Sequence, residues 1–210
     1  MRSVNRAWRT LSAVLGACAV AACAQQAEVV KLYESPDAGD AVFQNLFVVV
    51  ISSDEDLRQD FEHRLAAGLM RVGIAADPSH RTLPGQSEGM LQEDLNRAAA
   101  AAGSDAILVS HVVSVESSYG IEEGRSELKF ECRGGDPVDY FLYDHEILKE
   151  PDSVAAAHTV VVISNLYDTI DHARIWTIQS TCFDKASLHE AIAAESDAVV
   201  RQLRIDRLVH

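Results

Sequence analysis

Residues 46–57 read LFVVVISSDEDL and place an apolar segment directly before a polar, acidic one. The six residues 46–51 are β-branched, aliphatic or aromatic without a break, a pattern typical of a strand covered on both faces. Ser53 can cap a following helix through its hydroxyl, and the acids at 54–56 suit the positive end of that helix. The stretch therefore predicts a buried strand followed at once by a helix.

The predicted helix after Ser53 has one apolar stripe at helical spacing and ends near Gly73. The stripe consists of Leu57, Phe61, Leu65, Leu69 and Val72. The charged residues between them are predicted to lie outside the stripe; they are Arg58, Asp60, Glu62 and Arg64.

The alternation continues along the chain. Further strands are expected at 74–77, 106–115, 159–167 and 174–182. The last two are expected to pair as an antiparallel hairpin. Further helices are expected over 90–102 and after the capping box that begins at Ser187. The order βαβαβ, an insertion and ββα predicts an α+β or α/β fold. We expect a two-layer or three-layer-like sandwich with a mixed sheet of about five strands and three helices. The expected domain spans 43–210, with the insertion at 117–157.

The amino-terminal residues 1–22 have the features of an export signal. Three Arg precede an apolar run that ends at Ala24, about 14 residues where a membrane span needs roughly 20. The run closes with Val20-Ala21-Ala22-Cys23, which resembles the bacterial lipobox and predicts Cys23 as the acylated first residue of the mature chain. Ala24 after the Cys favours the outer membrane, with the domain facing the periplasm, and residues 23–42 are then expected to be the lipidated Cys and a linker.

Two other interpretations of this segment remain open. Leu15-Gly16-Ala17-Cys18 is a poorer copy of the lipobox. Ala22-Cys23-Ala24 also fits ordinary signal peptidase, which would leave a soluble periplasmic protein that starts at Gln25. Acylation at Cys23, with chains such as palmitate, would instead hold the domain on a membrane almost irreversibly.

The charge of the chain argues against nucleic acid as a partner. The full sequence has 18 Lys and Arg against 32 Asp and Glu. Cleavage after residue 22 removes three Arg and no acid, which leaves 15 cations, 32 anions and a net charge of -17 on 188 residues. Phosphate-backbone binding needs clustered cations, so we expect no nucleic acid.

Two cysteines remain beside the lipidated position, Cys132 and Cys182. An exported compartment is oxidising enough for them to pair, and a bridge across about 50 residues could stabilise the fold by roughly 4 kcal/mol. The alternative is two separate thiols, with Cys182 packed as a small hydrophobe at the end of a strand and Cys132 in a loop. The sequence leaves both open.

The insertion at 117–157 mixes turn formers with aromatic residues, which suit either a contact surface or an extra hairpin. The aromatic residues are Tyr119, Phe130, Tyr140, Phe141 and Tyr143. In the hairpin alternative, 128–131 pairs with 138–143 and covers the sheet.

Catalytic and metal-binding signatures are weak. Gly85-Gln86-Ser87-Glu88-Gly89 matches the G-x-S-x-G string of serine hydrolases, but the preceding residues are no buried strand, and Ser87 suits the cap of the next helix better. Asp144-His145-Glu146 and Asp171-His172 come nearest to metal ligands, yet solvation in loops explains them better. We expect no enzyme activity, no metal and no cofactor.

The order of elements and a few short strings resemble a group of uncharacterised bacterial outer-membrane lipoproteins. These strings are Arg71-Val72-Gly73, 103–109, Asn165-Leu166-Tyr167-Asp168 and Ile175-Trp176-Thr177. Their small α/β domain is similar to the TolB amino-terminal, CsgG and LpoB type. The resemblance implies a lipid-anchored accessory protein of the cell envelope that binds an envelope protein or self-associates. The alternative is a carrier of a small ligand or lipid, with a pocket near Trp176.

Overall fold

The computed structural model of the chain describes residues 27–36, 41–83, 92–119 and 156–210. Six strands and three α-helices lie in these ranges. The strands are β1 (Glu28–Glu34), β2 (Asn45–Ile51), β3 (Ala75–Pro78), β4 (Ala106–Tyr119), β5 (Ala156–Asp168) and β6 (Arg174–Lys185). The helices are α1 (Glu55–Arg71), α2 (Gln92–Ala101) and α3 (Leu188–Ile205), with a short 3₁₀ turn, η1 (Ser79–Arg81), after β3.

The six strands form one mixed sheet in the order β1-β6-β5-β4-β2-β3. β2 pairs in parallel with both β3 and β4, whereas β4, β5, β6 and β1 pair antiparallel in series. The long hairpin of β5 and β6 confirms the antiparallel pair predicted from the sequence. The fold class is therefore the predicted one, a mixed sheet with three helices.

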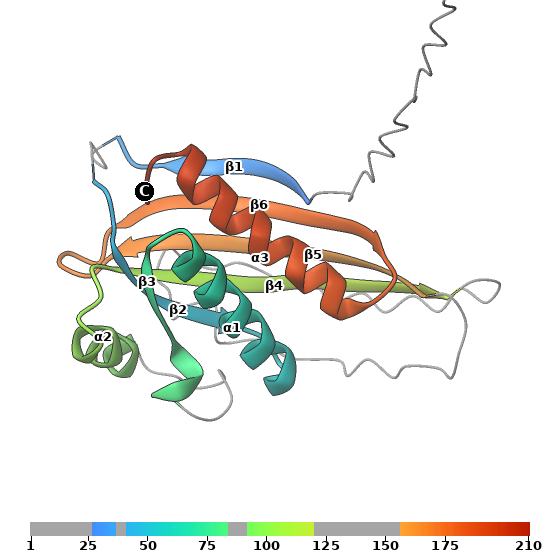
Figure 1. Cartoon of the computed structure of the whole chain (residues 1–210), viewed down its shortest axis with the longest axis horizontal. Helices are drawn as coiled ribbons and strands as arrows, with labels where there is room; N and C mark the ends of the chain where they lie inside the picture. Colours follow the sequence, from blue (N-terminus) through green and yellow to red (C-terminus); the bar gives the residue numbers. More distant parts are fainter. Residues whose placement is uncertain (1–26, 37–40, 84–91, 120–155) are drawn as a thin grey trace, which may run out of the picture.

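The helices lie on two sides of this sheet (Figure 1). α1 and α3 run side by side over one face, where the larger apolar core fills the space between them and the sheet. α2 covers the other face at β2, at β4 and at Tyr167 of β5, through a smaller cluster that includes Leu95, Ala99, Phe47 and Val49. β2 is thus buried on both faces, as its unbroken apolar run predicts.

The helix ends follow their caps, with one correction. The cap of α1 is Asp54 rather than the predicted Ser53: its carboxylate accepts hydrogen bonds from the backbone N–H groups of Asp56 and Leu57. Gly73, just after α1, has φ +88°, a backbone conformation that costs a side-chain-bearing residue more than glycine. Ser187 caps α3 as predicted, because its hydroxyl accepts from the N–H of Glu190.

Two boundaries differ from the prediction. Residues 28–34 were assigned to a linker, yet they form β1, the sixth strand, which pairs antiparallel with β6. Three charged residues break this seven-residue edge strand into short apolar pieces, so it has no long apolar run by which the sequence could reveal it. The expected insertion at 117–157 is shorter, because β4 continues to Tyr119 and β5 begins at Ala156, so the segment between these strands is 120–155.

Candidate functional site

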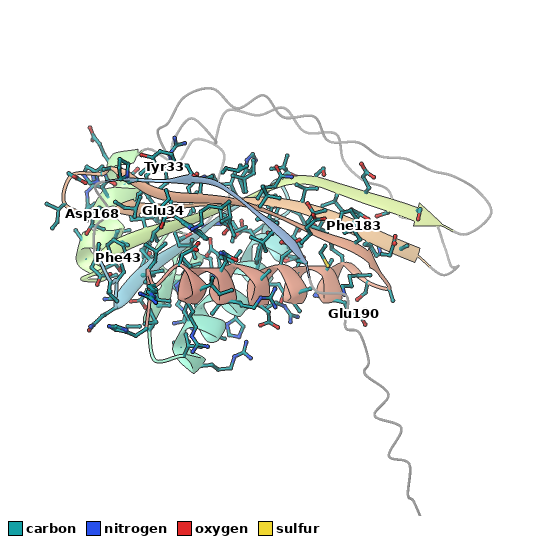
Figure 2. The ribbon with its side chains drawn as sticks, turned by 90° about the horizontal axis from the view of Figure 1, so that it is seen from above. Tyr33, Glu34, Phe43, Asp168, Phe183 and Glu190 are labelled. Carbon is teal, nitrogen blue, oxygen red and sulfur yellow. The ribbon has the colours of Figure 1, made fainter. Side chains whose placement is uncertain are left out.

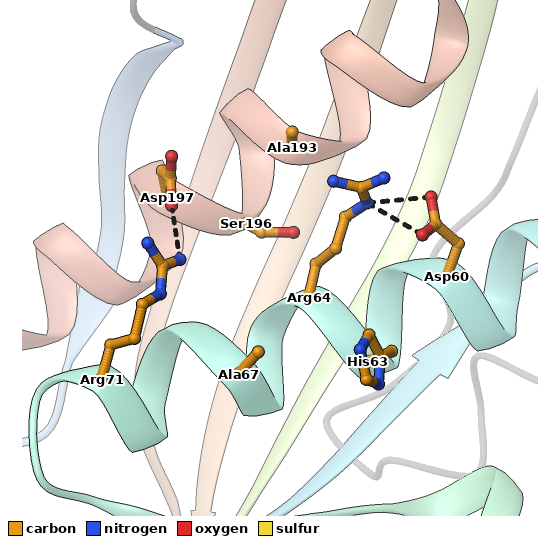
Figure 3. Close-up of a pocket in the computed structure, with 8 residues that line it drawn as sticks. All are labelled: Asp60, His63, Arg64, Ala67, Arg71, Ala193, Ser196 and Asp197. Carbon is orange, nitrogen blue, oxygen red and sulfur yellow. Dashed lines mark hydrogen bonds and ion pairs between the residues drawn. The ribbon is translucent and has the colours of Figure 1, made fainter.

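A groove of about 390 Å³ lies between α1 and α3 (Figure 3). The two helices approach closely at Gly68, where an added Cβ would lie 3.1 Å from Cγ2 of Val200. Ala67 on α1 and Ala193 on α3 line the groove beside this crossing, and Arg64 projects from α1 toward α3. Small residues on both helices therefore keep the groove open.

Ion pairs lie at both ends of the groove. Arg64 donates through Nε to both carboxylate oxygens of Asp60, each at 2.9 Å, and His189 Nδ1 lies 2.9 Å from Oδ2 of the same residue. Burial alone would raise the pKa of Asp60, but the hydrogen bonds from Arg64 and His189 outweigh it and hold the pKa below its usual value. Arg71 and Asp197 form the other pair at 3.3 Å, exposed to solvent.

A second polar cluster is buried under the first turns of α1. Arg58 and Glu62 are fully buried, which corrects their predicted place on the solvent side of the helix. Glu62 Oε1 accepts from Arg58 Nε at 3.2 Å and from Ser79 Oγ at 2.6 Å, and Oε2 accepts from the backbone N–H of His80 at 2.7 Å. This cluster joins α1 to η1 and, through the N–H of Val50 at 3.0 Å, to β2.

A third buried polar group lies between α3 and β6. Glu195 is fully buried, and the hydroxyl of Ser180 on β6 donates to its Oε2. Burial raises the pKa of Glu195 to about 7, although the hydrogen bonds from Ser180 and from the backbone N–H of Cys182 act in the opposite direction. Burial also raises the pKa of the neighbouring Cys182 thiol to about 11.

The sequence already held a signal for both buried glutamates. Glu195 lies three residues after Ile192 and four before Val199, which places it on the apolar stripe of α3. Arg58 and Glu62 share a helix face with Leu65 and Leu69 by the same spacing. A charged residue in register with an apolar stripe is therefore the pattern that marks these sites.

Trp176 is part of the main apolar core. Its side chain is fully buried, and Nε1 donates to Oδ2 of Asp206 at 2.7 Å. The other oxygen of Asp206 pairs with Lys31 Nζ of β1 at 2.7 Å. These hydrogen bonds hold the pKa of Asp206 below its usual value against the effect of burial. Asp206 thus joins β1, β6 and the end of α3.

The sheet face opposite α1 and α3 is uncharged over β5 and β6, and we call it the uncharged face. Alternate residues of these strands, such as Val160 and Ile178, point into the main core. The uncharged face is formed by the residues between them, Thr159, Val161, Ile163, Gln179, Thr181 and Phe183, together with Val30 of β1. Phe183 and Val30 are 45% and 49% exposed, and Figure 2 shows Phe183 and Asp168 toward opposite ends of the sheet.

Charged residues lie at the margins of this face in the strand register, among them Arg174 of β6, which pairs with Tyr167 and lies over the ring of Tyr33. Glu28 pairs with Thr181, and Glu116 pairs with Thr159. None of the helices in the described ranges covers the uncharged face over β5 and β6. An uncharged sheet surface on a chain of this net charge is suited to contact with protein.

Several predicted site residues lie outside the described ranges. These are Cys23, Cys132, Phe130, Tyr140, Phe141, Tyr143 and the Gly85–Gly89 string with Ser87. Tyr119 is the last residue of β4. Cys182 is buried on β6, and because Cys132 lies outside the described residues, both the pairing of the two cysteines and the alternative of separate thiols stay untested predictions.

Within the described ranges, no three His, Cys, Asp or Glu side chains gather where they could hold a metal ion. Over the same ranges, no helix combines the length and apolar character that a membrane crossing requires. Asp171 and His172 lie in the turn between β5 and β6, where both are exposed.

No protein-family model matches this chain, and no curated protein sequence matches it. Among the solved structures to which the chain is similar are two bacterial proteins. The PelC dodecamer from Paraburkholderia phytofirmans is 14% identical, with 84% of this chain and 96% of that chain covered and a TM-score of 0.47. The lipoprotein GNA1162 from Neisseria meningitidis is 16% identical, with 77% and 98% covered and a TM-score of 0.41. At these values the likenesses assign neither function nor assembly to this chain.

Proposed function

We propose that this chain is a lipid-anchored accessory protein of the bacterial cell envelope that works by binding protein, and that a second copy of the chain binds its uncharged face. The anchor is Cys23, on the outer membrane with the domain in the periplasm. The observation that carries the proposal is the uncharged face itself.

Charge repulsion supports this choice of surface. Two mature chains of net charge -17 repel each other over most of their surfaces. The uncharged face is where two copies can approach with the least repulsion, and Phe183, Val30 and Val161 supply apolar area for the contact. Like charges at the margin, Glu28 and Glu116, would then restrict how the copies align.

The anchor also brings copies together. Four residues lie between Cys23 and Glu28, and the five steps from one to the other reach at most about 17 Å. Acylation of Cys23 therefore keeps the Glu28 end of the sheet near the membrane. Confinement to a surface raises the effective concentration of copies, so that a weak contact is sufficient.

The test combines chemical crosslinking in intact envelopes with mass spectrometry of the mature amino terminus. We expect an acylated Cys23, a crosslinked species of two or more copies, and loss of this species in Phe183→Asp, which puts a charge on the uncharged face. The matched control is Ile170→Asp, because Ile170 is 90% exposed in the turn between β5 and β6, away from that face. Cys23→Ser should weaken crosslinking by releasing the chain from the membrane.

Four outcomes would contradict the proposal. The anchor is wrong if the amino terminus is an unmodified Gln25 or Met1. Self-association through this face is wrong if only monomer is found, or if Phe183→Asp and Ile170→Asp behave alike. A chain in which residues 120–155 protect the face from labelling would also remove it as a contact surface.

A small-ligand carrier is the alternative function, and the groove between α1 and α3 is the observation in its favour. The groove lies on the outer side of the helix layer and not beside Trp176, where the sequence placed it. Binding of a small envelope molecule that is lost in Ala193→Trp, with crosslinking unaffected, would favour the carrier.

A further inference from the structure

Glu195 is a buried carboxyl group with no cation acting on it among the described residues. It is fully buried between α3 and β6, and its Oε1 has no hydrogen-bond partner among the described residues. Its polar neighbours are the hydroxyl of Ser180 and the backbone N–H of Cys182. An ionised carboxylate in such a place lacks the pairing that would offset its lost hydration.

The charged groups on the elements that pack against α3 have other partners. On α1, Arg64 binds Asp60, and Arg71 binds Asp197 of α3 itself. On β1, Lys31 binds Asp206 near the end of α3.

Further titratable groups lie on β5, on β6 and in the first turn of α3. On β5, His158 Nδ1 lies 2.9 Å from Ser117 Oγ. On β6, Cys182 and Lys185 interact with each other, and on α3 His189 binds Asp60. None of these cations is among the groups that act on Glu195.

We propose that Glu195 makes the packing of α3 on the sheet dependent on pH, with the neutral acid as the form that the interior accepts. In the neutral form the carboxyl O–H can donate a hydrogen bond to the hydroxyl of Ser180, and in the ionised form that hydroxyl donates to the carboxylate. One hydrogen bond between the two side chains is therefore kept in both protonation states. In the ionised form a charge is buried with an oxygen that nothing satisfies, and α3 is the element that can move to hydrate it.

The direction of the effect follows from the pKa. The pKa of Glu195 rises from 4.5 to about 7 on folding, so its contribution to stability is fully present below 4.5 and is lost as pH rises through 7. α3 is therefore held most tightly in mild acid.

A change in the packing of α3 also changes the groove between α1 and α3. Ser196 and Asp197 follow Glu195 directly on α3 and line the groove, as does Ala193 two residues before it. A displacement of α3 alters the spacing of these residues from Arg64 and Ala67 on α1. Whatever the groove binds, its affinity should change near neutral pH.

The test is hydrogen exchange of the mature protein in neutral detergent micelles at pH 5.5 and pH 8, corrected for the intrinsic exchange rate. Protection of α3 amides in the wild-type chain should fall roughly 25-fold between these values, the ratio that the two pKa values predict. Glu195→Gln, a neutral isostere, should remove that change. Glu190→Gln is the control, because Glu190 is exposed on the same helix.

Two results would overturn the proposal. One is an equal pH response in the wild-type chain and in Glu195→Gln. The other is a carbon-13 titration of the Glu195 carboxyl in the wild-type chain with a midpoint below 5, a measurement that stands even if the variant fails to fold. Neither result bears on crosslinking through the uncharged face.

Discussion

Glu62 and Glu195 are equally buried, on helices that cover the same face of the sheet, yet their surroundings are opposite. Glu62 has a guanidinium at 3.2 Å and accepts hydrogen bonds through both oxygens. Glu195 has no cation and one unsatisfied oxygen among the described residues. The comparison teaches that burial alone does not set the charge of an acid: the partners supplied by neighbouring elements decide it.

The largest effect should come from removing the cation of the first site. Arg58→Met keeps most of the side-chain volume but leaves Glu62 buried without its ion pair, and we expect a loss of about 3–5 kcal/mol in the free energy of unfolding. Denaturant unfolding at pH 8 measures it. Arg97→Met is the control, since the Arg97–Asp94 pair is exposed on α2 and should contribute less than about 0.5 kcal/mol.

A second variant sharpens the same comparison. Arg58→Met combined with Glu62→Gln removes both charges and should recover part of the loss. Recovery would show that the site around residue 62, like the site around Glu195, is more stable with an uncharged side chain than with an unpaired carboxylate. If the single variant loses less than about 1 kcal/mol, the ion pair is not what holds Glu62 in place.

The next effect is the pH dependence of the wild-type chain. Between about pH 4.5 and pH 8 the stability should fall by up to about 3 kcal/mol through Glu195, whereas Glu195→Gln should lack this component. The difference between the two chains in free energy of unfolding against pH isolates it from histidine titration. A constant difference across the range would mean that the pKa of Glu195 is the same in the folded and the unfolded chain.

At lower pH, other carboxyl groups change the stability in the opposite direction to Glu195. The pKa values of Asp60 and Asp206 lie below the usual 3.8, so their contribution to stability is present above that value and is lost as pH falls further. The maximum in stability should therefore lie in mild acid, between the two effects.

The smallest effect should come from Ser180→Ala. The hydroxyl of Ser180 lowers the pKa of Glu195, so its removal should move the titration midpoint upward and cost about 1 kcal/mol. Ser164→Ala is the matched control: its buried hydroxyl is 2.8 Å from that of Ser110, on the same face of the sheet. Ser164→Ala should lose similar stability with no change in the pH response; an altered response would show that any buried hydroxyl affects Glu195.

The elements with strong periodicity were predicted well, and the buried polar groups were not. The apolar run at 46–51 and the stripe of α1 gave β2 and α1 to within a residue or two. Arg58 and Glu62 were predicted to face solvent because an average charged residue on a helix does, and only η1 packing against α1 encloses them. The sequence does not predict β1, because its three charged residues fit a linker as well as an edge strand.

By itself, the sequence determined the kind and order of the elements other than β1 and the net negative charge, since these depend on composition and on spacing along the chain. The tertiary structure decided the strand order, the uncharged face, the groove between α1 and α3 and the different environments of Glu62 and Glu195. These features depend on which distant segments meet, and spacing within one segment contains no information about its partners across the sheet.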